Sequence, residues 1–332
     1  MIKPKSLRST CKLFIPDSTG SKLCIHYIPP YQVGECGFCD CPTIFRCHEE
    51  LKQKQPSLSH SAVQTWTACK MAYYYYYVLG IRIKAEHLPK VMKMGSIWDK
   101  FIEVQHFGNM DDVIDLKQKY NLEELESAKL SALMDAYKDL EIGSNITLGQ
   151  PQLEVQSNIS GNTVVGFVDV AHDNYFEEHK LTTRPEKYLA VESIFNQVGT
   201  YFLAVQDWEY VQMMIVRTPG LYLRKEESID SYYKRTYDDI ISRPGYYFQG
   251  YDNTTRTYGN TTKFYRDEFD LEHLKSKYGY IFQEIRDTLN RGSWYQEEQF
   301  CLDPYPCPYY DIKKTGVVSE NIYYYSTGKK ER

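Results

Sequence analysis

The chain lacks long apolar runs and an excess of positive charge. No stretch approaches the roughly 20 apolar residues of a membrane-spanning helix, and the opening residues MIKPKSLRST lack the apolar core of a signal peptide. We therefore expect a soluble, intracellular, cytoplasmic protein with no membrane partner. The 332 residues carry a formal net charge of −5. This charge counts against a protein that coats nucleic acid, although an enzyme needs only a local basic groove.

Cysteine is scarce over most of the chain and concentrated near its start. Six of the nine cysteines lie in the first 47 residues. Cys36-x-x-Cys39 has the spacing with which two thiolates bind one zinc ion. We expect a cysteine-rich, zinc-binding segment over 1–56, with ligands drawn from Cys24, Cys36, Cys39, Cys41 and Cys47 and with His26 and His48 as alternatives. The other interpretation is a loop of reduced cysteines.

The stretch 164–180, VVGFVDVAHDNYFEEHK, organises the rest of the chain. Two runs rich in Val and Phe flank a turn at Asp173-Asn174, which predicts a β-hairpin. Its register pairs residue 170 with residue 177 and places Asp169 opposite Glu178, where like charges repel. Lys180 shares their face. A divalent cation, Mg²⁺ or Mn²⁺, would remove the repulsion. The alternative is an ordinary amphipathic hairpin before a core helix.

Three short motifs follow one another in this part of the chain. They are Gly166-x-x-Asp169, Glu178-x-Lys180 and Gln197-x-x-x-Tyr201. The ordered set resembles the PD-(D/E)xK nuclease superfamily, in the RecB-like branch of phage and CRISPR-adaptation exonucleases. The resemblance implies an α/β, restriction-endonuclease-like core with a central mixed β-sheet flanked by helices. It also implies catalytic roles for Asp169, Glu178, Lys180, Gln197 and Tyr201, and metal binding by Asp169, Glu178 and the backbone carbonyl of His179.

The chain departs from the family pattern at two places. Asp99 stands where the family usually has a metal-binding histidine, and a carboxylate is a good ligand for Mg²⁺ or Mn²⁺. Glu103, one turn later, is the alternative acid. Family members with a 4Fe-4S cluster use four cysteines, whereas this chain offers three, Cys69, Cys301 and Cys307, so a fourth ligand must come from elsewhere. The alternative is a clasp of the two chain ends without a cluster.

The pattern of apolar residues predicts the remaining elements. Helices are expected over 57–80, 93–107, 193–205 and 269–291, with a helical insert over 111–140. Strands are expected over 153–159 and 210–216, and hairpin or loop over 217–270. We therefore divide the chain into the cysteine-rich segment 1–56, a nuclease domain over 57–325, and a basic tail over 326–332.

These observations predict a metal-dependent deoxyribonuclease, a RecB-like exonuclease acting on single strands or DNA ends, in a cell or a phage-infected host. DNA is the expected partner, with Arg184 and Lys187 as phosphate contacts and some of the 31 tyrosines stacking on bases. Two alternatives stay open. One is a non-catalytic nucleic-acid-binding protein with a degenerate nuclease fold and a structural metal site. The other is an unrelated intracellular metalloprotein.

Overall fold

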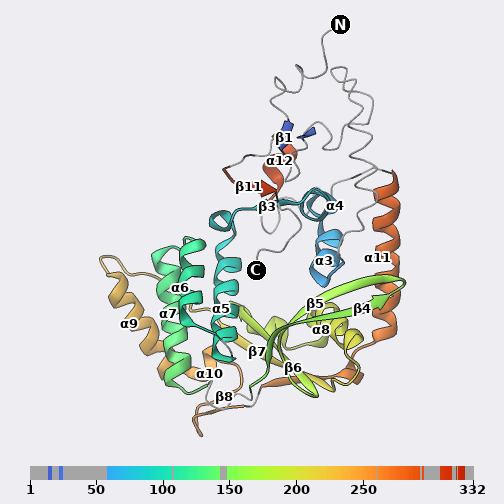
Figure 1. The fold of residues 1–332 in the computed structure, drawn as a ribbon. Coiled ribbons are helices and arrows are strands. Elements are labelled where there is room, and N and C mark those ends of the chain that lie inside the picture. The colour runs from blue at the N-terminus through green and yellow to red at the C-terminus, as the bar shows by residue number, and fades with distance from the viewer. Residues whose placement is uncertain are drawn as a thin grey trace. The chain divides into compact units, whose positions relative to one another are not determined.

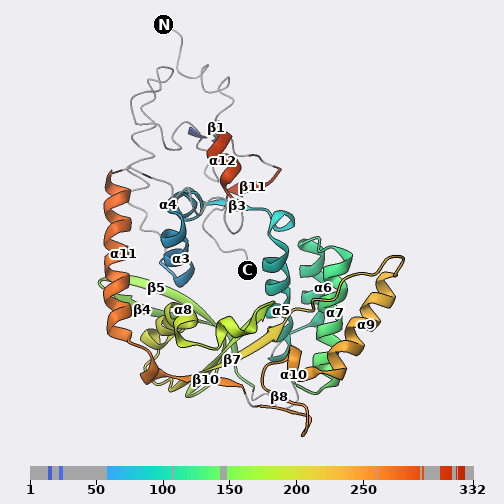
Figure 2. The same cartoon turned by 180° about the vertical axis from the view of Figure 1, so that it is seen from behind.

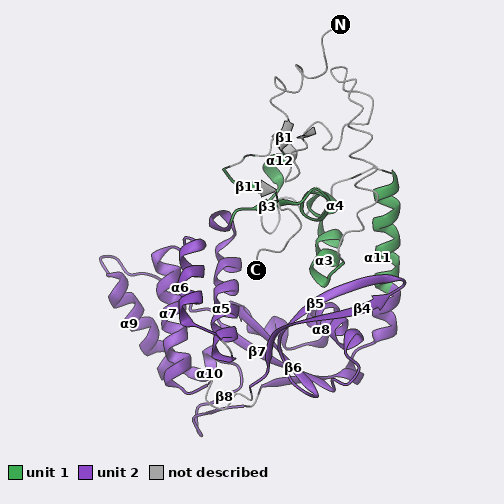
Figure 3. Ribbon diagram, viewed as in Figure 1, with its two compact units in different colours: residues 1–84, 277–332 green, residues 85–276 purple. Residues whose placement is uncertain are grey.

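The computed structural model describes residues 58–106, 108–142, 148–259, 261–291, 307–315 and 321–325, together with 294 and 319. It also describes the backbone of two short paired strands, β1 (Phe14–Pro16) and β2 (Lys22–Cys24). The chain divides into two compact units, residues 1–84 with 277–332, and residues 85–276 (Figure 3). The division falls within one helix, α11 (Leu271–Arg291). The domain boundaries predicted after residues 56 and 325 stay predictions.

The unit formed by residues 85–276 is built on a five-stranded mixed sheet (Figure 1). The strand order is β10-β7-β6-β5-β4, and only β6 and β7 run parallel. The strands are β4 (Gln150–Ile159), β5 (Asn162–Ala171), β6 (Tyr175–Thr182), β7 (Tyr210–Arg217) and β10 (Thr262–Tyr265). Helices pack against this sheet, which confirms the predicted α/β fold with a central mixed sheet.

The predicted hairpin register is confirmed. Val170 pairs with Glu177 and Ala171 with Phe176, and the turn is closed by His172 N–H donating to the Tyr175 carbonyl at 2.9 Å. The parallel neighbour β7 is reached through α8 (Val191–Ala204), as expected for the strand–helix–strand crossover.

Two apolar cores lie against the sheet. In one core, Phe176 of β6 packs with Val198 and Phe202 of α8. In the other core, Val170 packs with residues of α5 (Lys90–His106) and α7 (Glu124–Asp139), including the fully buried Trp98. Val170 pairs with Glu177 across the hairpin, and paired residues share one face of the sheet. Phe176 is the residue next to Glu177, so its side chain lies on the opposite face. With α6 (Met110–Lys119), α7 forms the predicted helical insert.

The prediction of hairpin or loop over 217–270 is wrong for its central part. Residues Ile229–Ser242 form helix α9, which Ser228 caps by accepting a hydrogen bond from Ser231 N–H at 3.2 Å. Tyr232, Thr236 and Ile240 are buried at helical spacing. Thr236, at the centre of this set, is polar, and the half-buried Tyr233 and Tyr237 lie between the buried positions, so the buried period does not stand out in the sequence. A short helix, α10 (Pro244–Tyr247), and the hairpin of β8 (Tyr251–Asp252) and β9 (Thr257–Tyr258) follow.

The other unit holds the rest of the described residues. Its helices are α3 (His60–Ala68), α4 (Lys70–Tyr73), a π-helical turn (Tyr74–Val78) and α12 (Tyr310–Thr315), and β3 (Ile81–Ile83) pairs with β11 (Tyr323–Tyr325). The single helix predicted over 57–80 is broken at Cys69, which is extended, and its Sγ accepts from Ala72 N–H. None of the helices in the described ranges is both long and apolar enough to cross a bilayer.

Candidate active site

Asp169 and Glu178 meet where the hairpin of β5 and β6 stops pairing through its backbone. The paired ladder ends at Val170 and Glu177. At the next position, Asp169 Oδ2 accepts the hydrogen bond of His179 N–H at 2.8 Å. The alternation of β5 changes here too, because Val168 and Ala171 both belong to the core that contains α8, whereas Val170 belongs to the other. The Asp169 carboxylate thus accepts the His179 N–H, which in a regular antiparallel ladder would donate to a backbone carbonyl.

Glu178 is almost fully buried, with 1% of its surface exposed. Its Oε1 accepts from the Lys180 ammonium and from Gln197 Nε2, the latter at 2.6 Å. Its Oε2 is buried without a hydrogen-bond partner. Burial, and then the negative charge of Asp169, raise the pKa of Glu178 from 4.5 to about 7. The site therefore holds a carboxylate whose charge the protein compensates only in part.

Lys180 provides the cation of the centre. Burial alone would lower the pKa of its ammonium, but the charges of Glu178 and Asp169 outweigh burial and raise it above the ordinary value. About a fifth of the side chain, 22%, stays exposed. The group is a permanent positive charge that a substrate can reach.

Asp99 of α5 joins this centre, whereas Glu103 does not. Burial, and then the charge of Asp169, raise the pKa of Asp99 from 3.8 to about 8, and the charge of Lys180 opposes the rise. Glu103 instead forms an ion pair with Lys100 at 2.7 Å on its own helix. Of the two acids between which the sequence left a choice, only Asp99 reaches the charges of Asp169 and Lys180.

Gln197 and Tyr201 connect α8 to both strands of the hairpin. The Tyr201 hydroxyl donates to the Phe167 carbonyl at 2.8 Å and accepts from Gln197 Nε2 at 3.1 Å. Because Gln197 also donates to Glu178, one helical turn fixes the position of the buried carboxylate. A β-carbon at Gly166 would lie 2.6 Å from the Tyr201 ring, so glycine is needed beneath it. The three motifs of the sequence therefore form one contact network.

A second polar cluster, centred on Glu177, was missed in the sequence. Its two carboxylate oxygens contact His172 Nε2 at 3.1 Å and His179 Nε2 at 3.2 Å. Burial would raise the pKa of Glu177, but the bonds from the two histidines outweigh burial and lower it to about 2. Neighbouring His106 is buried with neither ring nitrogen hydrogen-bonded. The sequence did contain a signal for this cluster. Consecutive residues of a strand point to opposite faces of the sheet, so Glu177 must lie on the face opposite to that of Glu178.

The other predicted site residues lie apart from this centre or outside the described residues. Arg184 and Lys187 are exposed beyond the end of β6. Cys69 and Cys307 contact the same core, in which burial, and then the two cysteines, raise the pKa of the Tyr75 hydroxyl. Cys301 lies outside the described residues, as do the side chains of the N-terminal set, Cys24, Cys36, Cys39, Cys41 and Cys47. The zinc site and the iron–sulfur cluster stay predictions.

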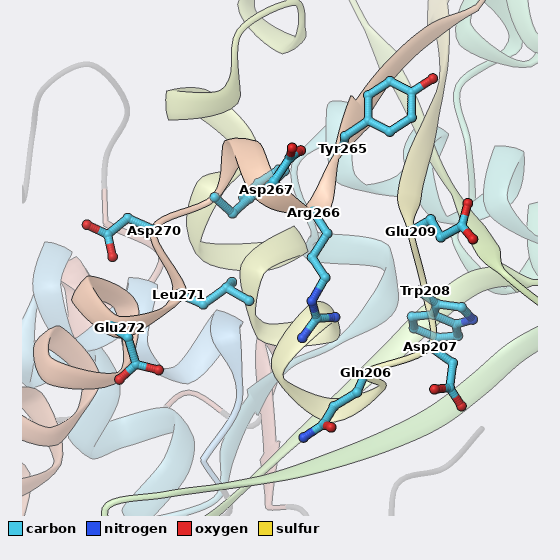
Figure 4. A pocket seen from close by; sticks show the side chains of 11 residues that line it. Gln206, Asp207, Trp208, Glu209, Tyr265, Arg266, Asp267, Asp270, Leu271 and Glu272 are labelled. Atoms are coloured by element: carbon cyan, nitrogen blue, oxygen red, sulfur yellow. The ribbon is translucent and has the colours of Figure 1, made fainter.

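A cavity of about 740 Å³ lies away from the centre, where β7 begins (Figure 4). Trp208 and Arg266 line it together with five acids, Asp207, Glu209, Asp267, Asp270 and Glu272. The Arg266 guanidinium donates a hydrogen bond to the Val205 carbonyl at 3.0 Å. A pocket with this excess of negative charge is unsuited to a phosphate, and we do not assign it to the active site.

Comparisons with known proteins give one distant likeness. No family model and no curated protein matches the chain. A solved structure from Eubacterium rectale, described as a "Putative exonuclease", is similar over 86% of this chain and 96% of that one, with 9% sequence identity and a TM-score of 0.46. A likeness this distant supports no conclusion about function.

Proposed function

We propose that the protein is a Mg²⁺- or Mn²⁺-dependent deoxyribonuclease with a restriction-endonuclease-like core, a RecB-like exonuclease acting on single strands or DNA ends. One observation carries the proposal. The acids Asp169 and Glu178 meet across two strands beside the Lys180 ammonium, and Glu178 Oε2 is buried with no hydrogen-bond partner. Leaving a buried carboxylate oxygen unpaired is costly, which supports a ligand for that oxygen.

The residues present fit a hard divalent cation. Such ions prefer carboxylate and carbonyl oxygens. Asp169, Glu178 and the His179 backbone carbonyl would hold the ion, with Asp99 as a further carboxylate. In the described ranges no three or more side chains of His, Cys, Asp and Glu are grouped as a ready metal site. The proposed set therefore depends on the His179 backbone carbonyl as a third ligand, or on Asp99 approaching the other two acids. When bound, the ion lowers the pKa of a coordinated water and offsets charge on the reacting phosphate.

The protein's own groups supply the remaining functions. Lys180 keeps its proton because of the surrounding carboxylates, so it presents positive charge to the scissile phosphate and stabilises charge that develops there. Gln197 holds Glu178 Oε1 and is itself held through Tyr201 to β5. These bonds fix the orientation of the carboxylate before substrate arrives, which avoids reorganisation during the reaction.

Digestion of end-labelled DNA tests the proposal. Single- and double-stranded substrates are incubated with the full chain in Mn²⁺, in Mg²⁺ and in chelator. Asp169→Asn, Glu178→Gln and Lys180→Ala are compared with Glu192→Gln, a matched loss of charge at an exposed position in the first turn of α8. We expect metal-dependent release of nucleotides by the wild type and by Glu192→Gln. Each active-site variant should lose at least about 100-fold, the scale for one lost charge-stabilising group.

The outcomes separate the alternatives. Equal cleavage by Asp169→Asn and Glu178→Gln rules out these acids as ligands. Binding of DNA without cleavage in either metal rejects the enzyme and leaves the non-catalytic nucleic-acid-binding protein. The position of the label in the products shows whether cutting starts at an end.

A further inference from the structure

An exposed tyrosine contacts two arginines near the end of the central sheet. The guanidinium carbons of Arg217 and Arg243 are each 4.5 Å from the centre of the Tyr246 ring. About half of Tyr246, 49%, is exposed. Guanidinium groups stack on aromatic rings and keep their N–H edges free for other partners. We call Arg217, Arg243 and Tyr246 the arginine–tyrosine cluster.

Strand register places this cluster next to the candidate active site. In the parallel pair of β6 and β7, Lys180 lies opposite Ile215 and Thr182 opposite Arg217. Arg217 is therefore two residues beyond the position facing Lys180, on the same side of its strand as Ile215. It also donates to the Thr183 carbonyl at 3.1 Å, directly after β6. The cluster thus lies where the parallel strands end, which is where open α/β sheets bind ligands.

The backbone holds Tyr246 at this edge. Val216 forms a bridge with Phe248, and Gln249 N–H donates to the Ile215 carbonyl at 3.0 Å. Figure 2 shows α10, which carries Tyr246, beside the arrowhead of β7. The cluster is therefore fixed to the same strand that lies beside Lys180.

The two arginines retain hydrogen-bonding capacity for an anion. Asp239 accepts hydrogen bonds from Nε and one terminal nitrogen of Arg243, at 3.0 and 2.7 Å. These two bonds orient the guanidinium, which also lies beside the Tyr247 hydroxyl, and its outer edge stays at the surface because about half of the side chain, 46%, is exposed. Besides the bond from Arg217 to the Thr183 carbonyl, its other terminal nitrogen has a loose ion pair with the exposed Glu186, at 3.7 Å, and its buried Nε has no hydrogen-bond partner. Planar guanidinium groups match the oxygens of a phosphate.

We propose that the arginine–tyrosine cluster binds the sugar–phosphate backbone of a DNA strand whose neighbouring phosphodiester lies at Asp169, Glu178 and Lys180. This inference rests on the proposed function and identifies its substrate-binding surface. Arg217 and Arg243 contact phosphates, and the Tyr246 ring holds both guanidinium groups in place. The contact reads no base sequence, because phosphates carry none.

Binding without cleavage tests the cluster. A fluorescent single-stranded oligodeoxynucleotide is titrated with the full chain in chelator, across a series of salt concentrations, and anisotropy gives the dissociation constant. Arg217→Gln, Arg243→Gln and Tyr246→Ala are compared with Arg256→Gln, a matched loss of charge on the exposed β8–β9 turn. Tyr246→Phe keeps the ring. Thermal unfolding followed by circular dichroism shows that each variant is folded, and exposed Arg243 keeps the test available should Arg217→Gln misfold.

We expect each arginine variant to weaken binding about tenfold or more at low salt, the scale for one charge-assisted contact. The slope of log affinity against log salt should become shallower by about 0.7 for each lost phosphate contact. Arg256→Gln and Tyr246→Phe should bind like the wild type, whereas Tyr246→Ala should weaken binding. The inference is overturned if both arginine variants keep the wild-type affinity and the wild-type slope of log affinity against log salt, while the wild type binds and cleaves DNA. The proposed function then still stands. A wild type that neither binds nor cleaves DNA overturns both.

Discussion

Tyr201 lies directly against Gly166, so that a β-carbon on Gly166 would sit 2.6 Å from the ring. The Tyr201 hydroxyl bonds to the backbone of the next residue, Phe167, and to Gln197, which holds Glu178. The absence of a side chain at one position thus permits the helix to approach the strand. The same contact sets the distance between α8 and the buried carboxylate.

Replacing this glycine should destabilise the protein and reduce nuclease activity. In Gly166→Ala the added methyl group must displace a ring that is only 4% exposed, and overpacking of this kind costs about 1–3 kcal/mol. Urea unfolding measures the loss. Gly95→Ala is the control, because a β-carbon there meets nothing within 4 Å and α5 should gain about 0.5–1 kcal/mol. Equal midpoints for the two variants would contradict the contact.

Tyr201→Phe should reduce catalysis more than stability. The variant keeps the ring but removes the bonds to the Phe167 carbonyl and from Gln197. A lost hydrogen bond of this kind costs about 1–2 kcal/mol of folding free energy. Because Gln197 then loses one of its anchors beside Glu178, we expect kcat for DNA cleavage to fall about tenfold or more. Single-turnover cleavage, compared with urea unfolding, separates the two effects, and a cleavage rate equal to that of the wild type excludes the positioning role.

Without metal, the carboxyls of Asp99 and Glu178 should make the fold less stable as pH rises. Their pKa values are raised from 3.8 to about 8 and from 4.5 to about 7 by burial and by Asp169. Each acid binds its proton more tightly in the folded chain than in the unfolded chain, so stability falls between about pH 4 and 8. Metal ligands must be ionised, so the rise in melting temperature on adding Mn²⁺ should grow over the same interval.

The control for this pH dependence is Asp99→Asn. Removing the acid with the higher pKa should make the metal-free stability depend less on pH between about pH 7 and 8, because only the remaining protonated fraction of Glu178 titrates there. A Mn²⁺-induced rise in melting temperature of equal size at every pH would show that the acids do not bind the ion.

Glu177→Gln should be strongly destabilising because the residue is buried and binds two histidines. The variant exchanges a carboxylate held by His172 and His179 for an amide that can accept through only one atom. Breaking a buried charged network costs about 3 kcal/mol or more. Glu154→Gln on the exposed side of β4 should change stability by less than about 0.5 kcal/mol. Urea unfolding midpoints of the two variants compare the costs.

The pH dependence of the Glu177 effect has the opposite sign. The pKa of Glu177 is lowered from 4.5 to about 2, because the histidine bonds outweigh burial. Its contribution to stability is therefore complete above about pH 4.5 and is lost as the pH falls through about 2. The stability difference between the wild type and Glu177→Gln should narrow over that interval. A constant difference would mean that the carboxylate charge is not what stabilises the fold.

Much of the candidate site could be predicted because its signals are local. The alternation of the hairpin strands and the turn at Asp173-Asn174 fix which residues pair, and the structure has that register. The four-residue spacing of Gln197 and Tyr201 puts them on one helical face, where both reach the hairpin. By contrast, α9 was missed because the polar Thr236 occupies a buried position and half-buried tyrosines lie between the buried ones. The helix predicted over 57–80 is broken at Cys69, although the apolar pattern continues through it.

The sequence by itself determined the strand pairing and the small set of acids that could share a metal. Only the tertiary structure decided that Asp99 rather than Glu103 joins them, that Glu178 Oε2 is left unpaired in the interior, and that Arg217 meets Tyr246. The physical reason is the distance along the chain over which each kind of interaction acts. Pairing and helical faces follow from the backbone over a few residues, whereas burial and charge at a site depend on elements far apart in the chain that pack against the same strands.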